Sequence, residues 1–217
     1  RLLLAREVVR AKIHNQRVLL MRNGEAPPAI LDQMRQFRDR APHAETESIL
    51  LGIEGEAAAL YFSQFATMVK NADFDFTRRN RRPPRDPVNA LLSMGYSMLA
   101  KELAGVCYAV GLDPFLGFYH HPRYGRPALA LDLMEEFRPL VADSLTLSLV
   151  NRGELDLQAD FLNSSHGCNL NQHGRRAYWQ GWFRRLDSEV SHPVFGYRMS
   201  YRRMFEVQAR QLGRFVR

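Results

Sequence analysis

Apolar residues recur every three or four positions along most of this chain, which is the spacing that places them on one face of a helix. One such run opens at Asp86-Pro87 and closes at Gly111. A second run covers residues 127–151 and contains Pro139, which should kink or split the helix because proline cannot continue the hydrogen-bond ladder. The pattern therefore predicts two long helices in the middle of the chain.

The same spacing predicts further helices on both sides of this central pair. They cover residues 6–22, 27–40, 44–70, 171–190 and 200–217. Segments with the alternating pattern of a strand are nearly absent, so we expect an all-α, multi-helix domain that occupies residues 1–217. Gly52 and Gly55 lie inside the helix predicted for 44–70, where each glycine costs roughly 1 kcal/mol relative to alanine. We expect a close neighbour there to explain them.

Residues 74–87 stand out as the segment that cannot be helical throughout, because five arginines and three prolines are packed into it. The whole chain is basic, with 30 Lys and Arg against 23 Asp and Glu, a net charge of +7 and a pI near 9.8. Almost all of the positive charge is arginine, whose planar fork grips phosphate through two hydrogen bonds. This composition favours nucleic acid as a partner over a membrane surface.

The arginine-rich loop is the first candidate for contact with DNA, since positive charge on a flexible strap can follow a phosphate backbone. Its arginines are Arg78, Arg79, Arg81, Arg82 and Arg85. The alternative is a loop that only keeps the protein in solution. Asn89 and Ser93 follow, four residues apart on one helix face, and could reach DNA or pack toward the core. Further along, a second basic face comprises Arg175, Arg176, Arg184 and Arg185, interleaved with aromatics that we assign to the core.

Cysteine usage and hydropathy indicate the cellular compartment of the protein. Cys107 and Cys168 are the two cysteines, the start has no secretory pattern, and no run of about 18 apolar residues occurs. We therefore expect a cytoplasmic protein without a membrane span. The chain starts at Arg1 and continues into an apolar stretch typical of the inside of an element, so we expect a segment that precedes it.

Carboxylates and one histidine form the candidate chemistry of the chain. They are Glu54, His120, Asp132 and Glu135, and Asp132 and Glu135 share a helix face because they lie three residues apart. Carboxylate oxygens with one imidazole suit Mn²⁺ and also accept Mg²⁺. Ligands from three separate elements would leave coordination positions open for phosphate oxygens. By spacing alone these residues match no short metal motif, and solvated surface charges are the alternative.

A zinc site built from His166, Cys168 and His173 is a weaker possibility. The spacing fits no standard zinc finger and the sequence offers no fourth ligand.

Four stretches of sequence together resemble a known family. They are residues 51–62 around Gly52-Ile53-Glu54-Gly55, residues 82–93, residues 111–120 ending in Gly117-Phe118-Tyr119-His120, and residues 132–139. In this order they are similar to the CRISPR adaptation integrase, the CRISPR-associated endonuclease of spacer acquisition. The resemblance runs from about residue 5 to the end of the chain. It implies that the chain is the helical catalytic lobe and that a small β-rich domain precedes it.

The resemblance also implies site residues and a reaction. Family members bind a divalent metal, Mn²⁺ or Mg²⁺, through positions that correspond to Glu54, His120 and Glu135, with Asp132 as a second acidic position of the catalytic set. The Gly-Phe-x-His pattern selects His120 over the adjacent His121. The reaction joins the 3′-hydroxyl of a short captured DNA duplex to a phosphate of the CRISPR repeat, and the same centre can nick DNA.

Partners follow from the resemblance as well. They are double-stranded DNA, a second copy of the chain in a homodimer, a small ferredoxin-like adaptation protein, and a fused or associated iron–sulfur exonuclease. Two rival functions stay open. A non-enzymatic basic helical module would bind DNA through its arginines alone. A metal phosphohydrolase of small nucleotides ranks last, because it needs a His-Asp pair and the chain has no such dipeptide.

Overall fold

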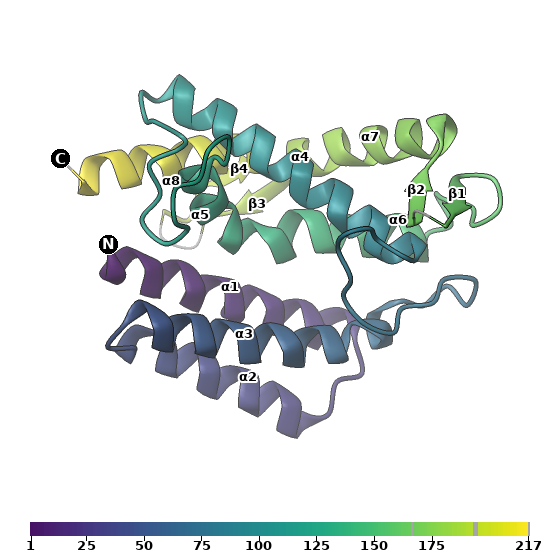
Figure 1. Cartoon of the computed structure of the whole chain (residues 1–217), viewed down its shortest axis with the longest axis horizontal. Coiled ribbons are helices and arrows are strands. Elements are labelled where there is room, and N and C mark those ends of the chain that lie inside the picture. Colours follow the sequence, from purple (N-terminus) through teal and green to yellow (C-terminus); the bar gives the residue numbers. More distant parts are fainter. Residues whose placement is uncertain (166, 193–194, 217) are drawn as a thin grey trace.

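The computed structural model describes residues 1–165, 167–192 and 195–216, and helices dominate these ranges (Figure 1). The α-helices are α1 (Leu2–Asn23), α2 (Pro28–Arg40), α3 (Glu47–Ser63), α4 (Pro87–Ala109), α5 (Ala128–Phe137), α6 (Ser144–Asn151), α7 (Gln172–Asp187) and α8 (Tyr201–Phe215). Short 3-10 turns η1 (Ala41–His43) and η2 (Phe65–Met68) follow α2 and α3. The predicted all-α class is confirmed.

The helices form two layers that meet along α1. In Figure 1, α1, α2 and α3 lie together in one layer, and α4 to α8 make up the other. The buried face of α1 presents Val9, Ile13 and Leu20 to the core, and this helix packs on α2 and α3 as well as on α5 and the turn that follows α5. Side chains of α1, α3 and α5 therefore converge where the layers touch.

The effect predicted for Pro139 is confirmed in a specific form. The helix is interrupted at η3 (Arg138–Asp143), a π-helical segment between α5 and α6. Such wider turns within helices often occur at functional sites because they re-aim side chains. Here Arg138 and Asp143 both lie in η3, and both contribute to the site described below.

Two small antiparallel hairpins were not predicted. β1 (Phe161–Ser164) pairs with β2 (Gly167–Leu170), and β3 (Glu189–Ser191) pairs with β4 (Arg198–Ser200). Strands of three and four residues are too short to show an alternating pattern. The helix predicted for 44–70 is also shorter, because α3 ends at Ser63.

Gly52 and Gly55 lie in α3, and no described protein residue is the close neighbour expected there. A Cβ added at either position would meet no described atom within 4 Å. Gly117, before the candidate histidine, is the opposite case: its Cβ would lie 2.7 Å from Ala128 Cβ and 2.7 Å from the His120 carbonyl oxygen. Within the described residues, no helix combines the length and apolar character needed to cross a membrane.

Candidate active site

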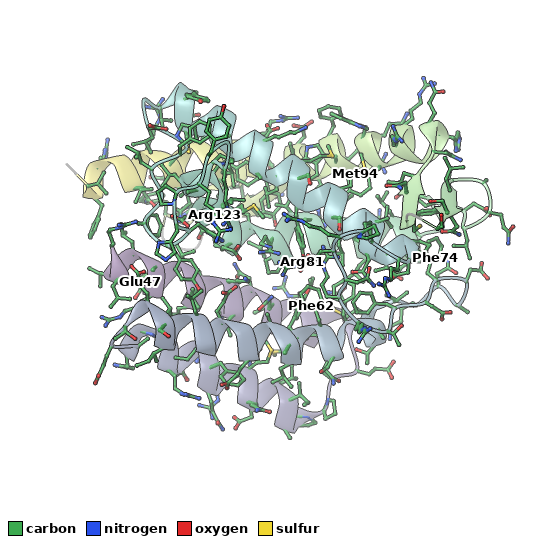
Figure 2. All side chains as sticks on the ribbon, in the orientation of Figure 1. Glu47, Phe62, Phe74, Arg81, Met94 and Arg123 are labelled. Atoms are coloured by element: carbon green, nitrogen blue, oxygen red, sulfur yellow. The ribbon has the colours of Figure 1, made fainter. Side chains whose placement is uncertain are left out.

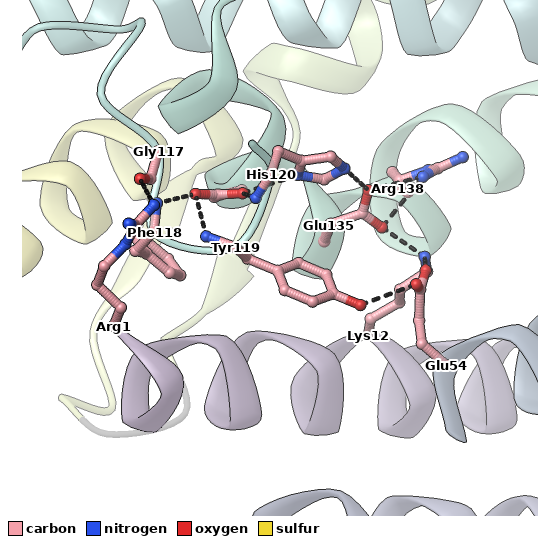
Figure 3. Close-up of polar contacts among 10 residues, drawn as sticks. Arg1, Lys12, Glu54, Gly117, Phe118, Tyr119, His120, Glu135 and Arg138 are labelled. Carbon is pink, nitrogen blue, oxygen red and sulfur yellow. Dashed lines mark hydrogen bonds and ion pairs between the residues drawn. The ribbon is translucent and has the colours of Figure 1, made fainter. Parts of the chain in front are cut away.

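The predicted residues Glu54, His120 and Glu135 come together at the junction of the two layers (Figure 3). Glu54 extends from α3 and Glu135 from α5, and both carboxylates contact the ammonium of Lys12 on α1. The Lys12 Nζ lies 2.5 Å from Glu135 Oε2. His120 belongs to the loop between α4 and α5, and its Nε2 lies 3.9 Å from Glu135 Oε1. The fold thus brings Glu54 and Glu135 to one buried positive charge and places His120 beside Glu135.

Sequence reasoning missed Lys12, although the pattern of α1 contains a signal for it. Lys12 is only 4% exposed and sits among the buried positions Val9, Ile13 and Gln16. A lysine between core positions of an amphipathic helix must find an anionic partner, because an unpaired buried charge is strongly unfavourable. That partner is the pair of carboxylates from α3 and α5.

Asp132 is the anchor of the loop that carries the histidine. Its fully buried carboxylate accepts backbone N–H groups from Phe118 at 2.6 Å, Tyr119 at 3.0 Å and His120 at 2.7 Å. The same carboxylate lies 2.7 Å from His120 Nδ1. Since a carboxylate accepts, Nδ1 donates, and Nε2 is left free to act as an acceptor or ligand. Gly117 allows the loop to fold over Asp132 in this way, because a side chain at this position would collide with its neighbours.

Glu135 is held as an anion by two cations. Arg138 donates from Nη1 to both of its oxygens, at 2.7 and 3.0 Å, and Lys12 contacts Oε2. Burial raises the pKa of Glu135, but the charges of Arg138 and Lys12 outweigh that effect and bring the pKa to about 2. Glu135 is therefore ionised at any physiological pH.

Tyr119 is a second participant that the sequence analysis did not identify. Its hydroxyl donates to Glu54 Oε2 at 2.9 Å, so the loop fixes one oxygen of this carboxylate while Lys12 contacts the other. Burial and the neighbouring Glu54 raise the pKa of Tyr119, so the phenol stays protonated and remains a donor.

The cluster continues into the interior through Arg138. Its guanidinium lies over the ring of Tyr96, 4.1 Å from the centroid. Tyr96 and Tyr61 donate to the buried Asp143, at 2.6 and 2.8 Å. Because this network joins α3, α4 and η3, it fixes Arg138 and, through it, Glu135.

The carboxylates of Glu54 and Glu135, with the imidazole of His120 beside Glu135, have the donor chemistry of a Mn²⁺ or Mg²⁺ site. In the described ranges, no three His, Cys, Asp or Glu side chains lie close enough in this arrangement to share a metal ion. The Lys12 ammonium instead holds the position between Glu54 and Glu135. The three residues therefore match such an ion in donor chemistry, and to bind it Lys12 would have to leave this position.

The arginine-rich loop presents four of its five arginines to solvent. Arg78, Arg81, Arg82 and Arg85 are exposed, whereas Arg79 is half-buried. The loop and α3 border a cavity of about 450 Å³ that includes Phe62. Figure 2 shows Arg81 over the junction of α3 and α4, close to Phe62.

Arg79 and Asn89 organise this loop. Arg79 donates to Asn89 Oδ1 at 2.5 Å and to Ser93 Oγ at 3.1 Å. Asn89 is fully buried, and its amide also bonds Asp86 and the Arg78 carbonyl. In this conformation Asn89 cannot touch DNA, so we assign to it and to the partly buried Ser93 the holding of the loop.

The other two candidates from the sequence are the zinc site and the second basic face. His166 lies outside the described residues, the Cys168 thiol is buried, and His173 bonds Asp160 Oδ1 at 2.5 Å.

On α7, Tyr178 and Trp182 are core residues as predicted, while Trp179 and Phe183 are 46% and 45% exposed. The basic side chains there are partly paired within the protein, with Arg184 bound to Glu154.

Comparison with known proteins identifies the family of the chain. The family model described as CRISPR associated protein Cas1 matches residues 1–184. The chain belongs to the Cas1 family. It is 50% identical, over 98% of its length, to a CRISPR-associated exonuclease Cas4/endonuclease Cas1 fusion of Geobacter sulfurreducens, of which it covers 40%. It is 43% identical, over 98% of its length, to a CRISPR-associated endonuclease Cas1 of Thermus thermophilus, of which it covers 62%.

Solved Cas1 structures share the helical fold. A Cas1 protein from Thermotoga maritima superimposes with a TM-score of 0.82 at 30% identity, over 97% of this chain and 66% of that one. A casposase bound to an integration product gives a TM-score of 0.83 at 24% identity, over 97% of this chain and 59% of that one, and supports the fold alone. The chain thus spans two thirds or less of each of these Cas1 relatives and neighbours.

Proposed function

We propose that this chain is the catalytic helical lobe of a metal-dependent DNA integrase and endonuclease. In this proposal it inserts captured short DNA duplexes into a CRISPR repeat array by transesterification with a 3′-hydroxyl. The observation that carries the proposal is that Glu54 and Glu135, from separate helices, meet at one buried cation, and that His120, from a loop, lies beside Glu135. Membership of the Cas1 family supports the assignment.

Glu54, His120 and Glu135 would hold Mn²⁺ or Mg²⁺. When bound, the ion would polarise the target phosphate and stabilise the departing oxygen. The protein side chains position this chemistry. Asp132 holds Nδ1 of His120 so that Nε2 faces Glu135, and Tyr119 fixes one oxygen of Glu54. Preorganisation of this kind supplies most of the catalysis in phosphoryl transfer, because the protein needs no nucleophile of its own.

The arginine-rich loop would hold the DNA close to this centre. Its exposed arginines carry charge that can pair with phosphates, and hydrogen bonds to Arg79 and Asn89 limit its freedom. A loop that is already ordered loses less entropy when DNA binds.

We also propose the partners that the family resemblance implies. The relatives that are fusions with an exonuclease support association with an iron–sulfur exonuclease. A solved complex of Cas6-RT-Cas1 with Cas2 gives a TM-score of 0.84 at 30% identity, over 97% of this chain and 63% of that one, and supports a small adaptation partner. Homodimer formation and a cytoplasmic location remain predictions.

A strand-joining assay on supercoiled repeat DNA tests the proposal. His120→Ala and Glu135→Ala should keep duplex binding and lose joining, because each removes a metal ligand without touching the arginine-rich loop. The chain offers neighbouring controls: His121 is exposed and Glu136 faces away from the cluster toward Gln208. His121→Ala and Glu136→Gln should join strands like the wild type. Normal joining by both ligand variants would refute the assignment.

The rival function, a non-enzymatic DNA-binding module, makes the opposite prediction for the acids. In that case wild-type protein should show no Mn²⁺ binding by calorimetry, and Glu54→Ala should change neither metal binding nor DNA binding. Loss of a measurable Mn²⁺ signal in Glu54→Ala would exclude this rival.

A further inference from the structure

A second basic site lies away from the candidate active site, in a cavity of about 420 Å³ along the C-terminal half of α1. The cavity is closed by η3, α6, the C-terminal end of α7 and the first residue of α8. Three arginines line it, Arg22 from α1, Arg152 after α6, and Arg185 from α7, and its lining contains no carboxylate. Positive charge is therefore concentrated here without an internal counter-charge.

The three guanidinium groups that line the cavity share one feature, the lack of a protein acceptor among the described residues. Within the described residues, none of them forms a hydrogen bond or an ion pair with a protein group. Neighbouring arginines do, as Arg184 pairs with Glu154 and Arg202 with Asp187. Arg185 is also half-buried, so its fork has lost part of its hydration without gaining a partner.

Tyr201 adds a hydroxyl to the same cavity. Its ring is buried, at 5% exposure, and burial raises its pKa, while the charges of Arg185 and Arg22 act in the opposite direction. Both arginines line the same cavity as this hydroxyl. Burial likewise lowers the pKa of Arg185, and the charge of Arg152 lowers it further against the opposing effect of Tyr201. A bound anion would relieve the repulsion between these like charges.

We propose that this cavity binds a phosphate group of the nucleic-acid backbone. Guanidinium forks from three elements, with a hydroxyl beside them, match the several oxygens of a phosphate better than a single ion pair would. The inference rests on the proposed function for its choice of nucleic acid as the source. Lys12 and Arg22 are ten residues apart on α1, or about 15 Å along the helix. A strand engaged at the candidate active site covers that distance in about five nucleotides.

Fluorescence anisotropy with a labelled 20-base-pair duplex tests the site, in EDTA and over a series of KCl concentrations. The test variant is Arg22→Gln/Arg152→Gln, which removes two exposed charges. The control is Arg203→Gln/Arg210→Gln, which removes two exposed charges from α8 that are paired with Glu206. Circular dichroism verifies that both variants fold, and both have the same net charge.

One phosphate contact is worth about 0.9 in the slope of log K against log salt. We expect the test variant to lose about that much slope and to bind about tenfold more weakly at low salt, since it loses charge-assisted hydrogen bonds to the phosphate; tenfold corresponds to about 1.4 kcal/mol. The control should keep the wild-type slope. An unchanged slope in the test variant, or an equal loss in the control, would overturn the site.

The failure of this inference is distinguishable from failure of the proposed function. Strand joining by wild-type protein, together with an unchanged salt slope in the test variant, overturns the cavity and leaves the integrase assignment intact. Absence of strand joining by the wild type, together with a slope loss confined to the test variant, supports the phosphate site and refutes the integrase.

Discussion

Replacement of Lys12 by methionine removes the one charge that both carboxylates of the cluster contact. Methionine keeps the length and apolar contacts of the lysine stem, so the change is mainly electrostatic. Without metal, Glu54 and Glu135 would face each other with no cation between them. We expect lower stability in the absence of metal and tighter metal binding.

The size of the stability loss follows from the remaining partners. Removal of one member of a buried ion pair typically costs about 3–5 kcal/mol. Glu135 keeps Arg138 at 2.7 Å and Glu54 keeps Tyr119 at 2.9 Å, so the lower end applies, about 3 kcal/mol. For a chain of this length each kcal/mol lowers the melting temperature by about 2–4 °C. The expected loss in EDTA is therefore about 6–12 °C.

Metal binding should change in the opposite direction. In the wild type an ion must displace the Lys12 ammonium, whereas the methionine variant has no such competitor. We expect the Kd for Mn²⁺ to fall about tenfold, which adds about 1.4 kcal/mol of stabilisation at saturating ion, or about 3–6 °C. Thermal unfolding in EDTA and in MnCl₂, with isothermal titration calorimetry, measures both effects.

Lys101 provides the matched control, because it is an exposed lysine on α4. Lys101→Met should leave both the melting temperature and the metal response unchanged. The reasoning is refuted if Lys12→Met is as stable as Lys101→Met in EDTA, or if Mn²⁺ stabilises it less than it stabilises the wild type.

Two further substitutions test other parts of the structure. Gly117→Ala places a Cβ 2.7 Å from Ala128 Cβ and from the His120 carbonyl oxygen, so we expect the free energy of unfolding in urea to fall by about 2–3 kcal/mol. Gly105→Ala, on the open face of α4, is the control and should raise the free energy of unfolding by up to about 1 kcal/mol. Burial raises the pKa of Glu136 from 4.5 to about 7 against the hydrogen bond from Gln208. The folded state then binds more protons between those values, and stability falls as the pH rises through that window. Glu136→Gln should be more stable than the wild type in urea at pH 8, and the gap should close toward pH 4.5; equal stability at pH 8 would contradict this account.

Helices of this chain were predictable because their apolar spacing is long and regular. The start of α4 at Pro87 and the break at Pro139 followed from proline geometry. The two hairpins could not be predicted, because strands this short show no periodicity. The width of the break at η3 was also unpredictable, since it depends on how α5 and α6 pack against α1 and α4.

The candidate site likewise contains residues that could be predicted from the sequence and residues that were missed. Glu54, His120 and Glu135 were identified by family resemblance, because three residues that lie far apart in sequence match no local motif. Lys12 and Tyr119 were missed, although a lysine among core positions was a usable signal. The two roles open to Asn89 could not be separated from the sequence, because an amide next to an arginine-rich loop has the same sequence signature whether it binds a ligand or its own loop.

The candidate site lies where the two layers of helices meet, so it forms only when the whole domain is folded. Lys12, Glu54 and Glu135 sit on three different helices, so any slippage of one layer over the other scatters them. A chain that is partly unfolded, or still emerging from the ribosome, consequently lacks a working centre. For a protein proposed to cut and join DNA, this arrangement confines reactivity to molecules that have finished folding.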